Sequence, residues 1–515
     1  MSERSAVFPD WIAHRAKGMP GRTALVVGGA EWTFAELDVE ITRATKKLAT
    51  LGVQAGDRIA ALLHNGFELA VLPHAVLRAG ATLVPLNVRL SEQELAWQLG
   101  DSKPRVLIID RRTRGQAMLA ASGDPAIRIV STEAHQAAED SIELLCEVAE
   151  SDLTLGLEHS GDAVLAIIYT SGTTGRPKGA MLTVSNFWWS AVGSALNLGT
   201  HADDKWLACM PLFHVGGLSI LLRSAIYGIT AVVHDGFDEV AVNAAIDDGA
   251  TIISVVAVML ERMLDQRNGA AYPGTLRCIL LGGGPAPVSL LERSASMSAP
   301  VVQTYGLTET CSQVATLSPE DAASRHGAAG KPLYPNEIRI APTSDGAPGD
   351  RAGEILVRGP IVMAGYFGQP RATFRAIEDG WLRTGDIGLV DDEGYLYVLD
   401  RRDDLIVTGG ENVYPAEVEA VLFSHPFIAE AGVIGITDKK WGQRVVAITR
   451  ISELTDGFAP DADALASWCR TRLAGYKIPA EFRFVSEPLP RTASGKLRRG
   501  ALREIANART DSTSG

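Results

Sequence analysis

The stretch AVLAIIYTSGTTGRPKG (residues 163–179) joins an apolar run to a loop rich in glycine and hydroxyl side chains. The apolar run, Ala163–Tyr169, has the length and composition of a buried strand. In open α/β sheets, ligands bind where such strands end. Glycines let backbone N–H groups converge on an anion, and Lys178 adds a positive charge. We therefore predict an α/β fold with a triphosphate-binding loop at residues 170–179.

The same pattern of a strand followed by a glycine turn recurs further along the chain. Arg277–Leu281 runs into GGGPAP, and Val301–Tyr305 runs into GLTET. Before the loop, residues 20–135 alternate short apolar runs with helical stretches such as Phe34–Leu51. This alternation extends the α/β prediction over most of the chain.

The character of the sequence changes near residue 400. A dense charged run, Asp-Arg-Arg-Asp-Asp, occupies residues 400–404, and a self-contained α+β pattern follows to about residue 506. Charged segments with few contacts are natural domain boundaries. We predict an N-terminal domain over 1–400, a hinge over 401–404, a C-terminal domain over 405–506 and a disordered tail over 507–515.

Composition narrows the classes of function. A net charge of −13 argues against an electrostatic grip on nucleic acid or anionic lipid. The five cysteines are scattered without a CxxC pair, so neither a disulfide framework nor a zinc site is expected. The N-terminus lacks a signal-peptide core, and no window resembles a membrane span. We expect a cytoplasmic protein without an integral membrane segment.

The loop at residues 170–179 does not have Walker A spacing. At every defining position it instead resembles the phosphate loop of the adenylate-forming superfamily, which contains acyl-CoA synthetases, luciferases and peptide-synthetase adenylation domains. Four further strings match that superfamily in order: QTYGLTE (303–309), GWLRTGD (380–386), Asp400-Arg401 and PRTASGK (490–496). The resemblance therefore covers roughly residues 20–505.

The resemblance implies ATP and Mg²⁺ as cofactors, coenzyme A as co-substrate and a small carboxylic acid as substrate. It also implies a large N-terminal domain, with two α/β sheet subdomains and a small β-barrel, and a small mobile α+β C-terminal domain. The implied ATP- and AMP-binding residues are Thr170, Ser171, Gly172, Thr173, Thr174, Gly175, Lys178, Gly283, Gly284, Pro285, Thr304, Tyr305, Gly306, Thr308, Asp386, Arg401 and Lys496.

Individual roles follow from the resemblance. Tyr305 is expected near adenine, Thr308 at a phosphate and Glu309 on Mg²⁺, which prefers hard oxygen ligands. The resemblance of their motifs implies that Asp386 and Arg401 bind the ribose of the nucleotide.

Three further roles concern the C-terminal part of the chain. Lys496 is expected to bridge the acid and the α-phosphate, and Asp403 falls at the hinge position. After rotation about that hinge, a loop containing Gly409, Gly410 and Glu411 is expected to form the channel for CoA.

The acid is indicated by strings that resemble bacterial o-succinylbenzoate–CoA ligases of menaquinone biosynthesis. These strings are LLGGGPAP (280–287), TETCSQ (308–313), TLSPE (316–320), DRRDDLIVTGGENVYPAEVE (400–419) and DKKWG (438–442). The implied catalytic residues are Lys496, Thr308, Glu309 and His214, and the implied acyl-substrate residues are His214, Arg223, Val258, Gly282 and Leu307.

The second carboxylate of such a substrate needs a cation, and Arg223 stands where these ligases carry a basic residue. A surface or salt-bridged arginine is the equally weighted alternative. Gly216 departs from the family, whose members usually have Ser there. A CoA ligase for another aryl, alicyclic or medium-chain acid therefore stays open.

A third hypothesis is a protein that does not use CoA, either a carrier-loading adenylation module or a catalytically silent relative. No carrier domain follows residue 506 in this sequence, and every expected catalytic position is filled. Both observations favour the ligase. The oligomeric state stays open, a homodimer included.

Overall fold

The computed structural model describes residues 6–90, 92–133, 143–153, 155–170, 177–284, 286–322, 324–342, 351–401, 406–408, 411–413, 415–438, 441–452, 460–473, 475–492, 495 and 497–507. The predicted site residues that lie outside this set are Ser171, Gly172, Thr173, Thr174, Gly175, Pro285, Asp403, Gly409, Gly410 and Lys496. Most of the tail predicted to be disordered lies outside it too.

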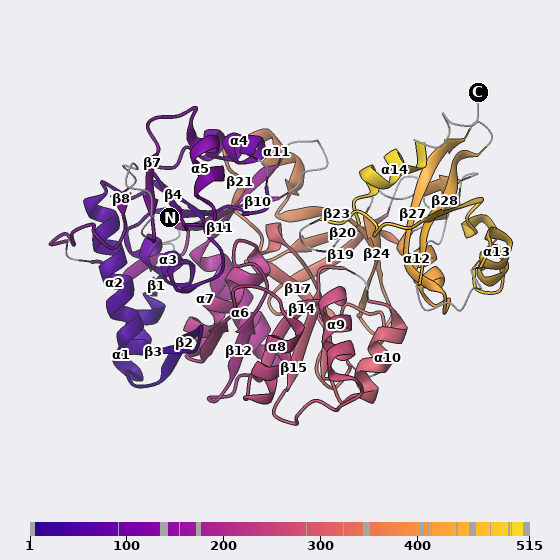
Figure 1. Cartoon of the computed structure of the whole chain (residues 1–515), viewed down its shortest axis with the longest axis horizontal. Helices are drawn as coiled ribbons and strands as arrows, with labels where there is room; N and C mark the ends of the chain where they lie inside the picture. Colours follow the sequence, from indigo (N-terminus) through magenta and orange to yellow (C-terminus); the bar gives the residue numbers. More distant parts are fainter. Residues whose placement is uncertain are drawn as a thin grey trace.

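Two large sheets form the N-terminal part of the molecule (Figure 1). The nine-stranded sheet has the order β18 (Lys331–Pro332), β17 (Ser312–Thr316), β16 (Val301–Leu307), β15 (Cys278–Gly282), β14 (Ile252–Val256), β12 (Lys205–Ala208), β13 (Thr230–Val233), β2 (Thr23–Val27), β3 (Ala30–Thr33). Strands from β16 to β2 are parallel, so their carboxyl ends lie along one edge.

The eight-stranded sheet contains the phosphate-loop strands. Its order is β21 (Gly365–Tyr366), β11 (Lys178–Thr183), β10 (Val164–Thr170), β5 (Thr82–Pro85), β4 (Arg58–Leu62), β6 (Val106–Ile109), β7 (Arg128–Ser131), β8 (Glu143–Leu144). The strands from β10 to β8 are parallel, whereas β11 runs antiparallel to β10 and β21 runs antiparallel to β11. A separate ribbon pairs β1 (Val7–Pro9) with β9 (Glu158–Ser160).

Helices fill the space between these sheets and cover their outer faces. They are α1 (Trp11–Gly18), α2 (Phe34–Thr50), α3 (Phe67–Arg78), α4 (Glu92–Ser102), α5 (Arg114–Ala121), α6 (Val184–Leu198), α7 (Val215–Tyr227), α8 (Glu239–Asp247), α9 (Ala257–Arg267) and α10 (Val288–Ser296). Helix α6 contacts β11 of one sheet and β17 of the other, and α7 packs on β12 and β13. One continuous apolar core, with Phe187 and Trp206 fully buried, therefore joins the two subdomains.

Local sequence signals set where these helices begin. Thr33 and Glu36 form a capping box at the start of α2, and Thr183 and Asn186 form one at the start of α6. The second box begins the helix directly after β11 and so fixes the exit of the phosphate-loop hairpin.

A third, antiparallel sheet and a small C-terminal sheet complete the fold. The third sheet contains β19 (Glu337–Pro342), β20 (Gly353–Arg358), β22 (Ile377–Glu378), β23 (Trp381–Val390) and β24 (Leu396–Arg401), with α11 (Pro370–Ala376) beside it. The C-terminal sheet has the order β26 (Glu411–Val413), β25 (Ile406–Thr408), β28 (Gly442–Ile451), β27 (Ile428–Asp438), and β29 (Glu481–Val485) pairs with β28.

Helices α12 (Pro415–Phe423), α13 (Ala462–Arg470) and α14 (Arg499–Asn507) pack with the C-terminal sheet around their own cores. Figure 1 shows this part at the right-hand end of the molecule. The predicted α/β fold with a small α+β C-terminal domain is confirmed.

Two expectations about composition can be compared with the structure. All five cysteines are described and none is in a disulfide, and only Cys146 is exposed. Among the described residues, no helix combines the length and apolarity that crossing a membrane requires.

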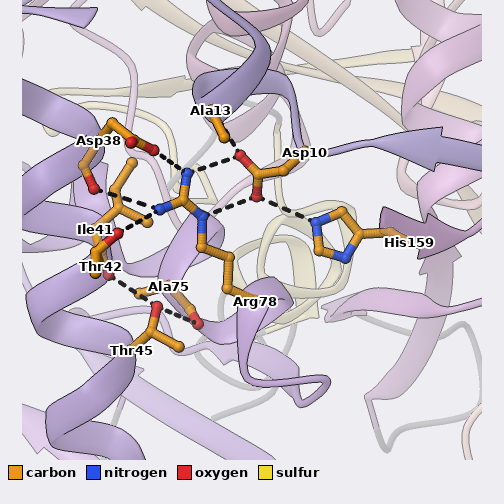
Figure 2. A network of polar contacts seen from close by, with 9 residues as sticks. All are labelled: Asp10, Ala13, Asp38, Ile41, Thr42, Thr45, Ala75, Arg78 and His159. Carbon is orange, nitrogen blue, oxygen red and sulfur yellow. Dashed lines mark hydrogen bonds and ion pairs between the residues drawn. The ribbon is translucent and has the colours of Figure 1, made fainter. Parts of the chain in front are cut away.

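A buried ionic network fastens the N-terminal helices together (Figure 2). Asp10 caps α1 by accepting from the Ala13 N–H at 2.9 Å, and it accepts from Arg78 Nε and Nη2 at 2.9 and 2.8 Å. Arg78 also donates to Asp38 of α2 at 2.5 Å, and His159 of β9 lies 3.2 Å from Asp10. Burial alone would raise the pKa of Asp10, but hydrogen bonds from Arg78 and His159 hold it well below its usual range.

Replacing Asp10 by Asn is expected to destabilise the protein by about 3–5 kcal/mol, because it leaves the buried Arg78 cation poorly compensated. The measurement is the urea midpoint of unfolding at pH 7. Because the folded-state pKa of Asp10 is lowered, its contribution is full above about pH 4 and is lost as the pH falls further. Asp38→Asn is the matched control. The Asp38 side chain is 31% exposed, so Asp38→Asn is expected to lose less stability. If it lost as much as Asp10→Asn, burial would not explain the effect at Asp10.

Candidate functional site

The predicted phosphate loop connects two adjacent antiparallel strands. Thr170, the last residue of β10, pairs with Lys178, the first residue of β11. The hydroxyl of Thr170 donates to the Lys178 carbonyl at 3.4 Å. The ends of the loop therefore lie side by side at the carboxyl end of β10, as the prediction requires, while residues 171–176 lie outside the described part of the chain.

Glu309 connects this hairpin to the end of β16. It lies in the short helix η1 (Thr308–Thr310), and its Oε1 accepts hydrogen bonds from Thr170 Oγ1 at 3.3 Å and from Tyr366 Oη at 3.0 Å. The ammonium of Lys178 lies 5.2 Å from the centre of the Tyr366 ring. A half-buried carboxylate therefore lies directly beside the predicted phosphate loop.

A carboxylate beside the predicted phosphate loop is a suitable ligand for Mg²⁺. The described residues contain no cluster of three or more His, Cys, Asp or Glu side chains able to hold an ion. Mg²⁺ is commonly held by one or two carboxylates and substrate phosphates while keeping several waters. The chemistry of Glu309 and its place beside the loop match that pattern.

The residues predicted to hold the nucleoside are also brought together. Tyr305 of β16 donates from its hydroxyl to Asp386 Oδ2 at 2.7 Å, and the Asp386 side chain is buried. Asp386 of β23 pairs with Arg401 of β24 in the sheet register. The motifs at 303–309 and 380–386, about 80 residues apart, thus meet in one place.

Two glycines of the site are required by close packing. A Cβ at Gly306 would lie 1.7 Å from the Ser312 carbonyl oxygen, where the register between β16 and β17 shifts. Gly283, after β15, has a φ of +83°, and a Cβ there would lie 2.9 Å from Val256. The neighbouring Gly282 lies against Thr304. Two residues with predicted binding roles are therefore next to each other.

The predicted acyl residues lie on or near α7. His214 precedes this helix and contacts Phe213 edge to face, with ring centres 4.7 Å apart. Its Nε2 is buried and has no hydrogen-bond partner among the described residues. Burial, with Arg89 nearby, lowers the pKa of His214 to about 4, so the ring is neutral at pH 7.

The structure gives a local reason for the unusual Gly216. A Cβ at this position would lie 2.9 Å from the terminal methyl of Met210. The space that a serine side chain would need is therefore taken by the end of the Met210 side chain.

Arg223 lies two turns into α7 and is only 2% exposed. Its Nη2 donates to Ser190 Oγ at 2.9 Å, and its guanidinium lies 5.7 Å from the centre of the Trp206 ring. Its Nε has no hydrogen-bond partner, and no carboxylate of the described residues pairs with it. Arg223 is therefore not a surface residue, and among the described residues it has no salt bridge. A buried cation without an anion is costly, and burial lowers the pKa of Arg223.

The other predicted acyl residues are distributed around the strand ends. Leu307 ends β16 and is half-buried, and Val258 lies in the first turn of α9 with 45% of its surface exposed. Thr308, Thr304 and Gly284 are described as well, at η1, in β16 and after β15.

Lys496 itself is not described, but its neighbours are. Arg491 and Leu497 form an isolated bridge, and Gly495 has a φ of +83°. A Cβ at Gly495 would lie 3.7 Å from Val256, the last residue of β14. Gly495, next to Lys496 in the chain, therefore lies near the carboxyl end of the nine-stranded sheet.

Near the predicted CoA channel, Thr408 of β25 pairs with Glu411 of β26. Gly409 and Gly410, like Asp403, lie outside the described residues.

Sequence reasoning missed one residue of this constellation, Tyr366. It follows Gly365, which has a φ of +139° and lies so close to Thr373 that a Cβ would be 2.6 Å away. A Gly-Tyr pair at a strand end was the available signal, but nothing in the chain order connects it to Glu309, 57 residues earlier.

Comparison with known proteins agrees with this geometry. A model of the AMP-binding enzyme family matches residues 12–367, and a model of the AMP-binding enzyme C-terminal domain matches residues 417–496. The chain belongs to the AMP-binding enzyme family. The predicted resemblance to adenylate-forming enzymes is confirmed.

Relatives of this AMP-binding enzyme are similar over its whole length. A 2-succinylbenzoate–CoA ligase of Geobacillus kaustophilus is 48% identical, covering 97% of this chain and 98% of the relative. The solved structure of o-succinylbenzoate CoA synthetase from Bacillus subtilis with its acyl-adenylate OSB-AMP has a TM-score of 0.88 and 42% identity, covering 97% and 98%. ATP-bound MatB from Rhodopseudomonas palustris has a TM-score of 0.86 and 28% identity, covering 97% and 99%.

Replacing Glu309 by Gln in this AMP-binding enzyme is expected to raise the half-saturating Mg²⁺ concentration and to slow adenylation about 10²-fold, because one preorganised charge is removed. Acid-dependent pyrophosphate release, titrated with Mg²⁺, measures both effects. Glu320→Gln, an exposed carboxylate beyond β17, is the control. If the Mg²⁺ dependence of Glu309→Gln were unchanged, Glu309 would not be a ligand of the metal.

Proposed function

We propose that this enzyme is an ATP-dependent 2-succinylbenzoate–CoA ligase of menaquinone biosynthesis. The single observation that carries the choice of acid is Arg223, a buried guanidinium without a carboxylate partner among the described residues. A dicarboxylic substrate supplies the missing anion. The full-length similarity to a curated 2-succinylbenzoate–CoA ligase supports the same assignment.

The reaction has two steps, because a carboxylate oxygen is a poor leaving group. In the first, the substrate carboxylate attacks the α-phosphorus of ATP, the bond to the β-phosphate breaks, and pyrophosphate leaves. In the second, the thiol of CoA attacks the acyl carbon, AMP leaves, and the thiol proton passes to solvent. The first step brings two anions together and therefore needs cations at the point of contact.

The residues divide between these tasks. We assign the triphosphate to residues 170–178, the nucleoside to Tyr305, Asp386 and Arg401, and the contact between acid and α-phosphate to Lys496. Glu309 would hold Mg²⁺, which neutralises phosphate charge when bound. The position of Glu309, 3.3 Å from Thr170, and the Tyr305–Asp386 hydrogen bond support this division.

For the acyl group, we assign the pocket to His214, Arg223, Val258, Gly282 and Leu307. A neutral, buried His214 adds no charge to an apolar pocket, which suits the uncharged part of an aryl substrate.

The second step requires a different arrangement of the C-terminal part. We propose that residues 401–404 are a hinge between a domain over 1–400 and one over 405–506. Rotation of the C-terminal domain about this hinge would move Lys496 away from the acyl-adenylate. It would bring the loop of Gly409, Gly410 and Glu411 there instead. We further propose a cytoplasmic location, which agrees with five unpaired cysteines.

A CoA ligase for another aryl, alicyclic or medium-chain acid is the second candidate. It is favoured by Gly216, because Met210 occupies the space of the serine that relatives usually have.

The test is pyrophosphate release over a panel of acids that contains 2-succinylbenzoate, benzoate and octanoate, with and without CoA. We expect the largest kcat/KM with 2-succinylbenzoate, and CoA-dependent release of AMP. A larger kcat/KM with a monocarboxylic acid would support the second candidate.

A further inference from the structure

A hollow of about 480 Å³ lies beside the phosphate-loop hairpin, and Lys178 is its one lining residue with a role proposed above. Its lining residues are Lys178, Gly368, Gln369, Pro370, Arg371, Ala372 and Arg375. Three of them are cations and none is a carboxylate, in a chain whose net charge is −13. Clefts lined by charges of one sign concentrate ligands of the opposite sign. The hollow is therefore suited to an anion.

The two arginines of the hollow are free to bind a ligand. Arg371 and Arg375 are exposed, one turn apart on α11, and neither has an ion-pair partner among the described residues. Surface arginines elsewhere in the chain are commonly paired, as Arg358 is with Glu337 and Arg112 with Asp235. A guanidinium presents its donors in a planar fork that fits two phosphate oxygens at once.

Helix α11, which carries both arginines, is joined through Tyr366 to the predicted metal carboxylate. Helix α11 is fastened to β21 because Thr373 Oγ1 accepts from the Tyr366 N–H at 2.9 Å. The Tyr366 hydroxyl donates to Glu309 at 3.0 Å, and its ring lies 5.2 Å from the Lys178 ammonium. Lys178 thus borders both the phosphate loop and the hollow.

We propose that the hollow is an exit site for inorganic pyrophosphate, in which Arg371 and Arg375 receive the product from the phosphate loop. The proposal rests on the proposed function, because that reaction breaks the bond between the α- and β-phosphates and releases pyrophosphate. Lys178, which we assign to the triphosphate, lines the same hollow as the two arginines. The phosphates of CoA share this chemistry, but the presence of Lys178 in the lining favours a product of the triphosphate.

The test compares the full-length wild type with Arg371→Gln/Arg375→Gln. Calorimetric titration with pyrophosphate, without any acid present, is expected to show about tenfold weaker binding in the double variant, because two exposed charge-assisted contacts are lost. In turnover, the inhibition constant of pyrophosphate is expected to rise by a similar factor, with the KM for CoA unchanged.

Arg111→Gln is the matched control. Arg111 is an exposed arginine that follows β6, four strands from β11 in the same sheet, and its replacement removes charge without touching the hollow. Since Arg371 and Arg375 are exposed, the single variants are expected to fold as well and to give intermediate effects.

Three results would overturn the proposal. The first is unchanged pyrophosphate binding in the double variant, and the second is an equal loss of pyrophosphate affinity in Arg111→Gln. The third is a raised KM for CoA with unchanged pyrophosphate inhibition, which would show that the hollow binds CoA. Failure of the proposed function is a separate observation. In that case no acid supports pyrophosphate release by the wild type. The calorimetric titration still measures whether the hollow binds pyrophosphate.

Discussion

Replacing Lys496 by Ala is expected to reduce acid-dependent pyrophosphate release by at least about 10²–10³-fold, the usual loss when one preorganised charge-stabilising group is removed. The same variant is expected to convert a pre-made acyl-adenylate and CoA to the thioester at nearly the wild-type rate, because that step no longer joins two anions. The position of Gly495 near Val256 supports this division, since it places the residue next to Lys496 in the chain near the sheet edge where the adenylation residues lie.

The two half-reactions of Lys496→Ala are measured separately. Pyrophosphate–ATP exchange reports the first, and CoA-dependent AMP release from added acyl-adenylate reports the second. Arg498→Ala is the control, because it removes an exposed cation from the same loop. If both half-reactions of Lys496→Ala fell together in a folded protein, the proposed separation of roles would be wrong.

Replacing Arg223 by Leu is expected to lower kcat/KM for 2-succinylbenzoate by about 100-fold, which corresponds to losing about 3 kcal/mol from a buried charge pair. Turnover of benzoate, which has no second carboxylate, is expected to change little. Arg223→Lys keeps the positive charge without the planar fork and should retain part of the activity.

The stability of Arg223→Leu distinguishes a substrate-binding role from a structural one. In the described structure Arg223 makes one hydrogen bond, to Ser190, and has no anion beside it, so an apolar replacement removes a desolvated charge. We expect the midpoint of unfolding without ligand to stay the same or to rise. A strongly destabilised Leu variant would show that Arg223 has a structural role. Equal losses of kcat/KM for benzoate and 2-succinylbenzoate would show the same.

The sequence predicted the parts of the site that lie in continuous motifs. Thr170, Lys178, Tyr305 and Asp386 are predicted because each lies in, or directly after, a strand or a glycine turn within a string that resembles a known family. Their mutual contacts, such as Tyr305 to Asp386, depend on how the subdomains pack. Local periodicity contains no information about that packing.

Other features could not be predicted for the same reason. Tyr366 meets Glu309 only because β21 adds to the edge of the eight-stranded sheet beyond β11. The choice between a surface and a buried Arg223 depended on which face of α7 packs against α6 and β12, and apolar residues occur all round that helix. The conflict between Gly216 and Met210 is likewise a contact between side chains that a linear pattern does not reveal.

The ionic network of Asp10, Asp38, Arg78 and His159 has a consequence for the lifetime of the folded state. It joins segments separated by up to 149 residues, so it can form only after large loops have closed. Interactions that are absent from the folding transition state slow unfolding and leave the folding rate nearly unchanged. We therefore expect Asp10→Asn to shorten the half-life of the enzyme towards irreversible heat inactivation much more than it slows refolding. The network would then determine how long the N-terminal domain stays folded rather than how quickly it folds.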